Sequence, residues 1–248
     1  MTIHPTAIVS AAAKLGNNVS IGAFSIIHDH VEVGDNSIIE SYCELGVSNH
    51  LSQGALLRLG ANTHIRSRST FYEGSVFGAG LVTGHNVTVR ERTIAGENLQ
   101  IGTLSDIQGH CVMGDYVRLH SNVHIGQKAK IGNFVWIFPY VVLTNDPHPP
   151  SAVMKGVTIE DYAAIATMTT ILPDVCVGRG ALVGAHSLVS KNVDADTVVA
   201  GSPAKFICLT NKIKLQDGSN RPAYPWTTHF HRGYPEEIVR QWLESINA

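Results

Sequence analysis

The sequence has few charged residues, no long hydrophobic run and no closely spaced cysteines. Charged residues make up 15% of the 248 residues and the formal net charge is −2, which argues against a disordered chain and against a basic DNA-binding surface. No apolar run approaches the roughly 20 residues of a membrane span, and the N-terminus lacks the features of a signal peptide. The four cysteines form no CxxC pair. We therefore expect a cytoplasmic protein with reduced thiols, and neither nucleic acid nor membrane as a partner.

The sequence does contain a six-residue repeat. Aliphatic residues recur at every sixth position over 3–57, then over 59–143, and again over 159–195. The exceptions to Leu, Ile, Val, Met or Phe at these positions are Thr83, Ala95 and Ala195. A period of six fits neither an amphipathic helix nor an alternating strand, but it fits a short strand followed by a sharp turn. Three such units make a coil of about 18 residues, which predicts an all-β parallel β-helix of about ten coils.

The repeat resembles that of the hexapeptide-repeat acyltransferases, which fold as left-handed parallel β-helices. The resemblance covers about residues 1–205, from the opening IHPTAIV to the closing GSPAKFI. It implies a left-handed helix, which is an exception to the usual right-handed crossover. It also implies acetyl-CoA as co-substrate, no metal, and a homotrimer with active sites between the subunits.

The repeat is interrupted twice and then ends. The first interruption is a slip of two residues at Arg58, and the second is the proline-rich stretch 144–158, which we expect to be an external loop. The β-helix domain is expected to span 1–204, and a C-terminal cap to span 205–248. A terminal helix should begin near Pro235 and carry four apolar residues on one face: Ile238, Trp242, Leu243 and Ile246. The extension should cover the last coil, and a substrate lid is the alternative.

Asp106 and His124 are 18 residues apart, so they should lie on neighbouring coils with backbones about 4.8 Å apart. A carboxylate at this position would hold one imidazole tautomer and stabilise the protonated ring. His120 should face outward around the adjoining corner, followed closely by Asn122. The alternative for these polar residues is a solvated or subunit surface. We therefore predict a catalytic pair of Asp106 and His124, with His120 and Asn122 as substrate-binding candidates.

A second candidate base is His148, in the stretch LTNDPHPPS. This stretch resembles the loop of galactoside and maltose acetyltransferases, which implies that His148 is the general base. The preceding Asn145 and Asp146 instead resemble the sugar-nucleotide N-acetyltransferases, in which that histidine is not constant. The resemblance makes Asn145 and Asp146 substrate-binding candidates. The alternatives are a solvated loop histidine and a turn aspartate before proline.

The segments HSNVHIG, PYVVLTNDPHPPS and KGVTIE together resemble the dTDP-3-amino-3,6-dideoxyhexose 3-N-acetyltransferases. That branch implies transfer of an acetyl group from acetyl-CoA to the amine of a nucleotide-linked sugar, for lipopolysaccharide or S-layer glycan synthesis. It implies direct attack of the amine on the thioester. Coenzyme A should run along the late coils, which carry Ala166, Gly184, Lys191 and Lys205.

Three other functions remain open from the sequence. One is a sugar O-acetyltransferase of the same fold. Another is a zinc enzyme of the γ-carbonic anhydrase type, with His85, His120 and His124 as ligands, although their spacing does not match that family. The third is a non-catalytic scaffold.

Overall fold

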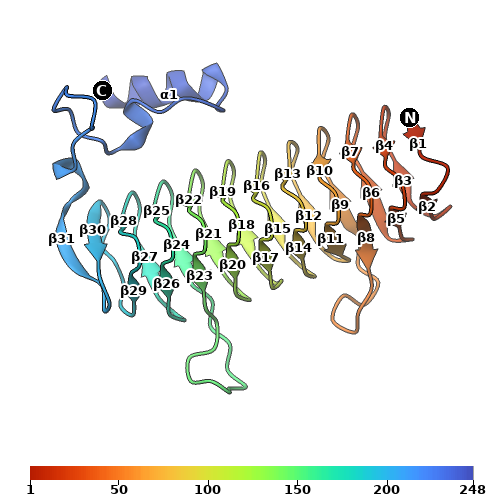
Figure 1. Ribbon diagram of the computed structural model, residues 1–248, viewed down its shortest axis with the longest axis horizontal. Helices are drawn as coiled ribbons and strands as arrows, with labels where there is room; N and C mark the ends of the chain where they lie inside the picture. Colours follow the sequence, from red (N-terminus) through yellow and green to blue (C-terminus); the bar gives the residue numbers. More distant parts are fainter. Residues whose placement is uncertain (248) are drawn as a thin grey trace.

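The computed structural model describes the backbone of residues 1–247 and the side chains of residues 1–244. The chain forms a left-handed parallel β-helix of about 11 coils, which confirms the predicted fold class (Figure 1). Each coil contributes one short strand to each of three parallel sheets, which we call faces A, B and C. Among residues 1–247, no helix is long and apolar enough to cross a membrane.

Most strands are two residues long. Face A contains β1 (Thr2–Ile3), β4 (Ser20–Ile21), β7 (Ile38–Ile39), β10 (His64–Ile65), β13 (Val82–Thr83), β16 (Gln100–Ile101), β19 (Arg118–Leu119), β22 (Trp136–Ile137), β25 (Ala164–Ile165), β28 (Leu182–Val183), β30 (Thr197–Ala200) and β31 (Lys205–Leu209). Face B contains β2 (Ile8–Val9), β5 (Ile26–Ile27), β8 (Glu44–Val47), β11 (Thr70–Tyr72), β14 (Thr88–Val89), β17 (Asp106–Ile107), β20 (His124–Ile125), β23 (Val142–Leu143), β26 (Thr170–Ile171) and β29 (Leu188–Val189). Face C contains β3 (Lys14–Leu15), β6 (Val31–Val33), β9 (Leu57–Leu59), β12 (Val76–Phe77), β15 (Ile94–Ala95), β18 (Val112–Met113), β21 (Lys130–Ile131), β24 (Thr158–Ile159) and β27 (Cys176–Val177).

The repeat builds this fold because its aliphatic positions point into the prism. Ile65, Ile107 and Ile125 are fully buried, and equivalent positions pair in register across successive coils, as Ile107 does with Ile125. The turns use left-handed backbone, for example at Asn86 (φ 55°) and Asn122 (φ 58°), a conformation that asparagine tolerates better than most residues. The coils therefore stack as rigid layers, and residues 18 apart lie one above the other.

The first interruption of the repeat is larger than the sequence indicated. Strand β8 ends at Val47, and residues 48–56 form a loop before β9. Leu59 pairs with Val33 of the preceding coil, and it takes the core position that follows Leu45. The predicted two-residue slip at Arg58 was therefore wrong, because an external loop separates these coils. Leu51 lies in that loop, and its spacing of six residues from Leu45 is coincidental.

Two buried carboxylates hold the loop 48–56 against the coils. Glu73 is 4% exposed. Its Oε1 lies 2.9 Å from His30 Nδ1, and its Oε2 accepts a 2.7 Å hydrogen bond from Ser52 Oγ. Glu91 is fully buried and accepts a 2.9 Å hydrogen bond from the Asn49 side chain. Burial raises the pKa of each carboxyl, but the hydrogen bonds outweigh burial and leave both pKa values below the ordinary value.

We expect this loop to loosen in acid. Because the pKa of Glu73 is lower in the folded chain than in the unfolded one, its charge stabilises the fold above about pH 4.5. That contribution is lost as the pH falls through the folded-state pKa. The protection factors of the amides of residues 48–56 should fall below about pH 4.5, and Glu73→Gln should already lower them at neutral pH. The exposed control Glu97→Gln should have no effect, and unchanged exchange in Glu73→Gln would contradict the assignment.

The C-terminal extension turns back along the prism. Strand β31 pairs antiparallel with β30 and covers one open edge of the last coil. The chain then passes through η1 (Thr210–Lys212) and η2 (Trp226–Thr228) to α1 (Glu236–Asn247), which lies alongside the coils (Figure 1). Beyond η1, the extension packs on the side of the prism and not over its end. The side chain of Ile246, which we expected on the apolar face, lies outside the described part of the structure, as does Ala248.

Aromatic residues join the extension to the coils. Trp226, Tyr234 and Trp242 are buried together. The Phe134 ring lies 5.2 Å from the Trp242 ring, and it stacks on Tyr116 at 5.1 Å. Trp226 also donates a 3.2 Å hydrogen bond to the carbonyl of Tyr162. The extension thus covers one edge of the last coil and also packs against the side of the prism next to face A.

Candidate functional site

Asp106 and His124 lie next to each other on face B, where β17 and β20 pair in register. His124 Nδ1 is 3.1 Å from Asp106 Oδ2, and the Gln108 amide donates a hydrogen bond to the same oxygen. Desolvation raises the pKa of Asp106, but the hydrogen bonds from His124 and Gln108 outweigh it, so the pKa lies below its usual value. The carboxylate is therefore ionised and holds His124 Nδ1–H toward itself, which leaves Nε2 as a proton acceptor.

Similar pairs occur elsewhere on the coils. Histidine nitrogens lie close to carboxylate oxygens in His28–Glu44 (3.0 Å), His30–Glu73 (2.9 Å) and His64–Glu40 (2.9 Å). A histidine–carboxylate pair alone therefore does not identify a catalytic centre in this fold. The Asp106–His124 pair differs by lying near the base of the second loop. A Cβ added to Gly126, two residues after His124, would lie 3.2 Å from Asn145 Oδ1, so the start of the second loop lies close to this coil.

The second loop, residues 144–157, contains the other predicted site residues. The backbone carbonyl of Asn145 accepts a 2.9 Å hydrogen bond from Lys155 N–H, which closes the neck of the loop. Asp146 Oδ2 accepts a hydrogen bond from Ser151 N–H at 3.2 Å, whereas Asp146 Oδ1 is buried and has no hydrogen-bond partner. His148 is exposed. The loop therefore presents an exposed imidazole and a half-satisfied carboxylate.

The residues expected to bind coenzyme A lie on the late coils. Ala166 and Gly184 follow β25 and β28 at the corner between faces A and B, where Ala166 N–H donates to the Val183 carbonyl at 2.9 Å. Lys191 and Lys205 are exposed. The four positions thus extend along the end of the prism that carries β31.

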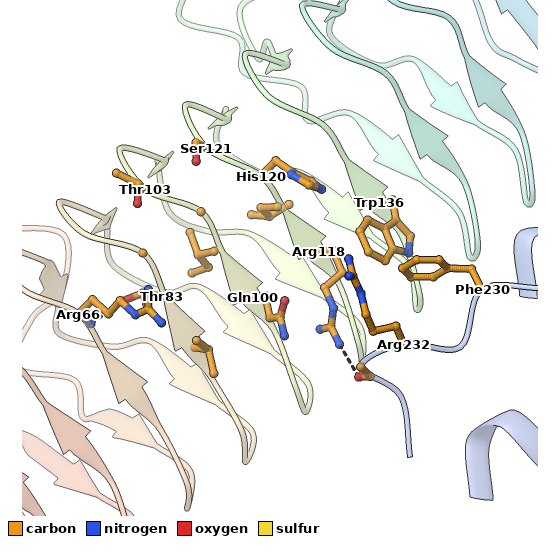
Figure 2. A pocket seen from close by; sticks show the side chains of 16 residues that line it. Arg66, Thr83, Gln100, Thr103, Arg118, His120, Ser121, Trp136, Phe230 and Arg232 are labelled. Carbon is orange, nitrogen blue, oxygen red and sulfur yellow. Dashed lines mark hydrogen bonds between the residues drawn. The ribbon is translucent and has the colours of Figure 1, made fainter. Parts of the chain in front are cut away.

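Face A carries a groove of about 510 Å³ that the sequence did not reveal (Figure 2). Gly84 and Gly102 line it at points where neighbouring coils approach each other closely. A Cβ added to Gly102 would lie 2.3 Å from the carbonyl carbon of His120 on the next coil. The C-terminal extension forms one wall with Phe230 and Arg232.

Three arginines line this groove: Arg66, Arg118 and Arg232. Arg118 is only 6% exposed; it donates hydrogen bonds to the carbonyls of Asn98 and Gly233, the latter at 3.3 Å. In the described part of the chain, the arginines that form ion pairs are others: Arg58, Arg90, Arg179 and Arg221. Desolvation lowers the pKa of Arg118, but a guanidinium remains protonated near neutral pH. The groove is therefore positively charged.

An aromatic pocket of about 370 Å³ adjoins the groove and shares its lining residues His120, Trp136, Phe230 and Arg232. The His120 ring stacks on Phe138 with centroids 4.7 Å apart and an interplanar angle of 13°. Desolvation lowers the pKa of His120, so its ring is neutral near pH 7. The structure thus places His120 in a cavity, while the neighbouring Asn122 forms the corner turn between faces A and B.

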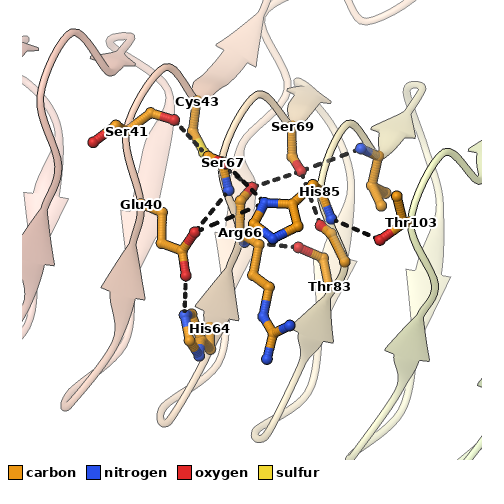
Figure 3. A network of polar contacts seen from close by, with 12 residues as sticks. Glu40, Ser41, Cys43, His64, Arg66, Ser67, Ser69, Thr83, His85 and Thr103 are labelled. Atoms are coloured by element: carbon orange, nitrogen blue, oxygen red, sulfur yellow. Dashed lines mark hydrogen bonds and ion pairs between the residues drawn. The ribbon is translucent and has the colours of Figure 1, made fainter.

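A second histidine cluster lies at the corner between faces A and B (Figure 3). Glu40 lies 2.9 Å from His64 Nε2 and accepts a 3.1 Å hydrogen bond from Ser67 N–H, and Ser67 Oγ lies 2.8 Å from His85 Nδ1. The six-residue repeat did not indicate this cluster, because the loop 48–56 separates Glu40 from its neighbours on the next coil. A register that allowed for that loop would have brought these residues together.

Within residues 1–247, no three His, Cys, Asp or Glu side chains gather in a way that could hold a metal ion. Within the described part of this one chain, His85, His120 and His124 are therefore not gathered into a metal-ligand group.

Comparison with known proteins indicates the class of protein. Residues 12–46 match the family described as bacterial transferase hexapeptide (six repeats). Over 118 residues the chain is 37% identical to serine acetyltransferase 2 of Arabidopsis thaliana, covering 45% of this chain and 33% of that protein. Over 93 residues it is 38% identical to 2,3,4,5-tetrahydropyridine-2,6-dicarboxylate N-acetyltransferase of Staphylococcus aureus (strain bovine RF122 / ET3-1), covering 38% of this chain and 33% of that protein. The chain thus spans about a third of the length of these curated relatives.

A solved structure agrees with the fold. The Arabidopsis UDP-N-acetylglucosamine acyltransferase superimposes with a TM-score of 0.66 at 19% identity, covering 84% of this chain and 74% of that one. The chain is therefore a hexapeptide-repeat β-helix similar to acyltransferases. The narrower resemblance to dTDP-amino-sugar N-acetyltransferases stays a prediction.

Proposed function

We propose that the protein is an acetyl-CoA-dependent N-acetyltransferase whose acceptor is a nucleotide-linked amino sugar. The observation that carries the proposal is the 3.1 Å contact of Asp106 with His124 beside the base of the second loop, in a fold shared with acyltransferases. The similarity of parts of the chain to two acetyltransferases supports acetyl-CoA as the donor.

In this mechanism the neutral sugar amine attacks the thioester carbonyl directly. Backbone N–H groups of the coils, or the Asn122 side chain, stabilise the oxyanion. His124 Nε2 accepts the proton that the amine loses, and Asp106 stabilises the resulting imidazolium. The carbon–sulfur bond then breaks, and the departing thiolate takes up the proton from the His124 imidazolium. The corresponding thiol has a pKa of about 8.5 in water.

The second loop offers an alternative base and an acceptor contact. His148 is exposed on the loop, whereas His124 is held by a strand and a carboxylate. Asp146 Oδ1 is buried without a donor, which is costly unless a ligand supplies one. An amine or hydroxyl of the sugar is such a donor. Asp146 and Asn145 are therefore proposed to contact the acceptor, with His124 as the base.

The function is tested by thiol release from acetyl-CoA in the presence of candidate acceptors. Amino-sugar nucleotides, the corresponding hydroxyl sugars and the free amino sugars are compared at equal concentration. We expect thiol release that requires the amino-sugar nucleotide, with one acetyl group found on its nitrogen. Release with hydroxyl sugars alone would indicate O-acetylation, and no release above background with any acceptor would contradict the proposal.

We further expect a homotrimer with active sites between subunits. Face C exposes apolar residues on successive coils: Val76 is 36% exposed, Ile94 53% and Val112 49%. Such a stripe is typical of a covered surface. Trp136 and Phe138 are not part of this stripe, because they line the pocket beside the C-terminal extension. Light scattering should give three times 26.7 kDa, and Ile94→Glu should lower that mass. A stable monomer of the unmodified chain would contradict the trimer.

A further inference from the structure

We propose that the groove on face A and the adjoining aromatic pocket form one binding site for a nucleoside diphosphate. The coils supply its floor, and the C-terminal extension supplies its wall. The site rests on the proposed function in one respect, because that function provides two sources of such a group. These are the nucleotide of the acceptor and the adenosine diphosphate part of coenzyme A.

The charge of the groove favours a ligand with more than one negative charge. Arg118 is almost fully buried, and two backbone carbonyls accept its hydrogen bonds. A guanidinium has five N–H donors, so donors remain for a ligand. Arg232 lines the groove beside it, with its guanidinium 5.9 Å from the centre of the Phe230 ring (Figure 2). Planar guanidinium groups recognise phosphate oxygens by paired hydrogen bonds.

The aromatic pocket favours a flat ring next to those phosphates. The stacked rings of His120 and Phe138 lie on one side of it. Trp136 and Phe230 meet edge to face with centroids 5.5 Å apart, and Trp136 Nε1 donates to Tyr234 Oη at 3.0 Å, which fixes the indole. Aromatic side chains bind nucleobases by stacking, a contact that is worth about 1–3 kcal/mol per base.

The two cavities are arranged in the order that the ligand requires. Arg232 lines both, so it lies where a base would meet its phosphates. Arg66 lies at the opposite end of the groove, three coils from Arg118 and about 14 Å along the prism (Figure 2).

Other ligand classes fit this site less well. An acyl chain would leave three guanidinium groups without counter-charges, which is costly for the buried Arg118. A neutral sugar requires neither the arginines nor an aromatic pocket of about 370 Å³. Inorganic phosphate would leave the aromatic pocket unfilled.

Tryptophan fluorescence of the full chain provides the test. All three tryptophans are in or beside the site: Trp136 and Trp226 line the aromatic pocket, and Trp242 lies 5.4 Å from Trp226. UDP, dTDP and ADP are titrated, with uridine, thymidine and adenosine as phosphate-free probes and pyrophosphate as the base-free probe. We expect a saturable change with at least one diphosphate, and binding at least about tenfold weaker for the matching nucleoside and for pyrophosphate.

Variants locate the site. Arg232→Gln removes an exposed guanidinium and Phe230→Ala removes the ring beside it, and each should weaken binding about tenfold or more. Arg240→Gln is the matched control, because Arg240 is an exposed arginine of α1 that lines a different pocket. Its affinity should equal that of the unmodified chain. An unchanged melting midpoint in Arg232→Gln excludes unfolding as the cause of weaker binding. No saturable binding of any diphosphate, or equal affinity in Arg232→Gln and Phe230→Ala, would overturn the proposal.

A competition experiment distinguishes the two sources. If saturating acetyl-CoA leaves the affinity for UDP or dTDP unchanged, the site holds the nucleotide of the acceptor. If acetyl-CoA displaces them, and Arg232→Gln weakens acetyl-CoA binding, the site holds coenzyme A. Either outcome supports a nucleoside diphosphate site.

The thiol-release assay separates this inference from the proposed function. Diphosphate binding that is lost in Arg232→Gln, together with no thiol release from any acceptor, would retain the site and overturn the transferase. Acceptor-dependent thiol release that is undiminished in Arg232→Gln, without diphosphate binding, would retain the transferase and overturn the site.

Discussion

Replacing His124 by asparagine is expected to lower kcat by a factor of about 10² to 10⁴, with little change in affinity for acetyl-CoA. Asparagine keeps the polar contact but cannot take up the proton that the amine loses. Asp106→Asn should cost a smaller factor, because this carboxylate orients and polarises the ring without touching the substrate. Steady-state kinetics with the preferred acceptor and a direct binding measurement with acetyl-CoA give the two quantities.

The chain offers a matched control for this experiment. His28 lies 3.0 Å from Glu44 on the first coils, and its side chain is 41% exposed, the same fraction as that of His124. His28→Asn should therefore leave kcat unchanged. Loss of activity in His148→Asn with a silent Asp106→Asn would make the loop histidine the base. If both His124→Asn and His148→Asn keep most of their turnover and the pH profile is flat near neutrality, the departing thiolate accepts the proton.

Truncation after Leu209 is expected to lower the melting midpoint by about 10 °C or more and to reduce solubility. The deletion removes the buried Trp226 and Trp242, and it exposes the rings of Tyr116 and Phe134 on the coils. Calorimetry of the full and shortened chains measures the effect. Trp226→Ala should reproduce part of it, since it removes both the packing and the hydrogen bond to the Tyr162 carbonyl.

The truncation also tests the alternative role of the extension. Because Phe230 and Arg232 line the groove, the shortened chain should lose nucleotide binding together with stability. An unchanged midpoint with lost binding would show that the extension is only a lid. Unchanged binding with a lower midpoint would show that it is only a structural cover.

The β-helix could be predicted because its repeat is local and strict. Each inward position needs one aliphatic side chain, and the spacing of six records that need directly. The Asp106–His124 contact followed from the same register, because no insertion lies between the two coils. The loop 48–56 was missed because Leu51 and Leu57 happened to continue the spacing, and the Glu40–His64 contact was missed with it.

The complete groove could not be predicted, because no periodicity relates the coil residues that line it to the C-terminal extension that forms its wall. Arg118 and the carbonyl of Gly233 are 115 positions apart, and the extension that joins them has no repeat. A weaker signal was present in the aromatic residues at equivalent turns of successive coils, Tyr116, Phe134 and Tyr162. A column of aromatic rings on the outside of a prism indicates a surface that another segment covers.

The return of the chain from the last coil to the middle coils also has a consequence for the order of folding. Within the prism every coil contacts only its neighbours, so coils can form one after another along the stack. The contact between Arg118 and Gly233 closes a segment of more than a hundred residues, and its entropic cost is offset only once the intervening coils are ordered. The extension should therefore dock last, and hydrogen-exchange pulse labelling during refolding should protect its amides after those of the coils. The arginine-lined groove would then exist only in the completely folded chain.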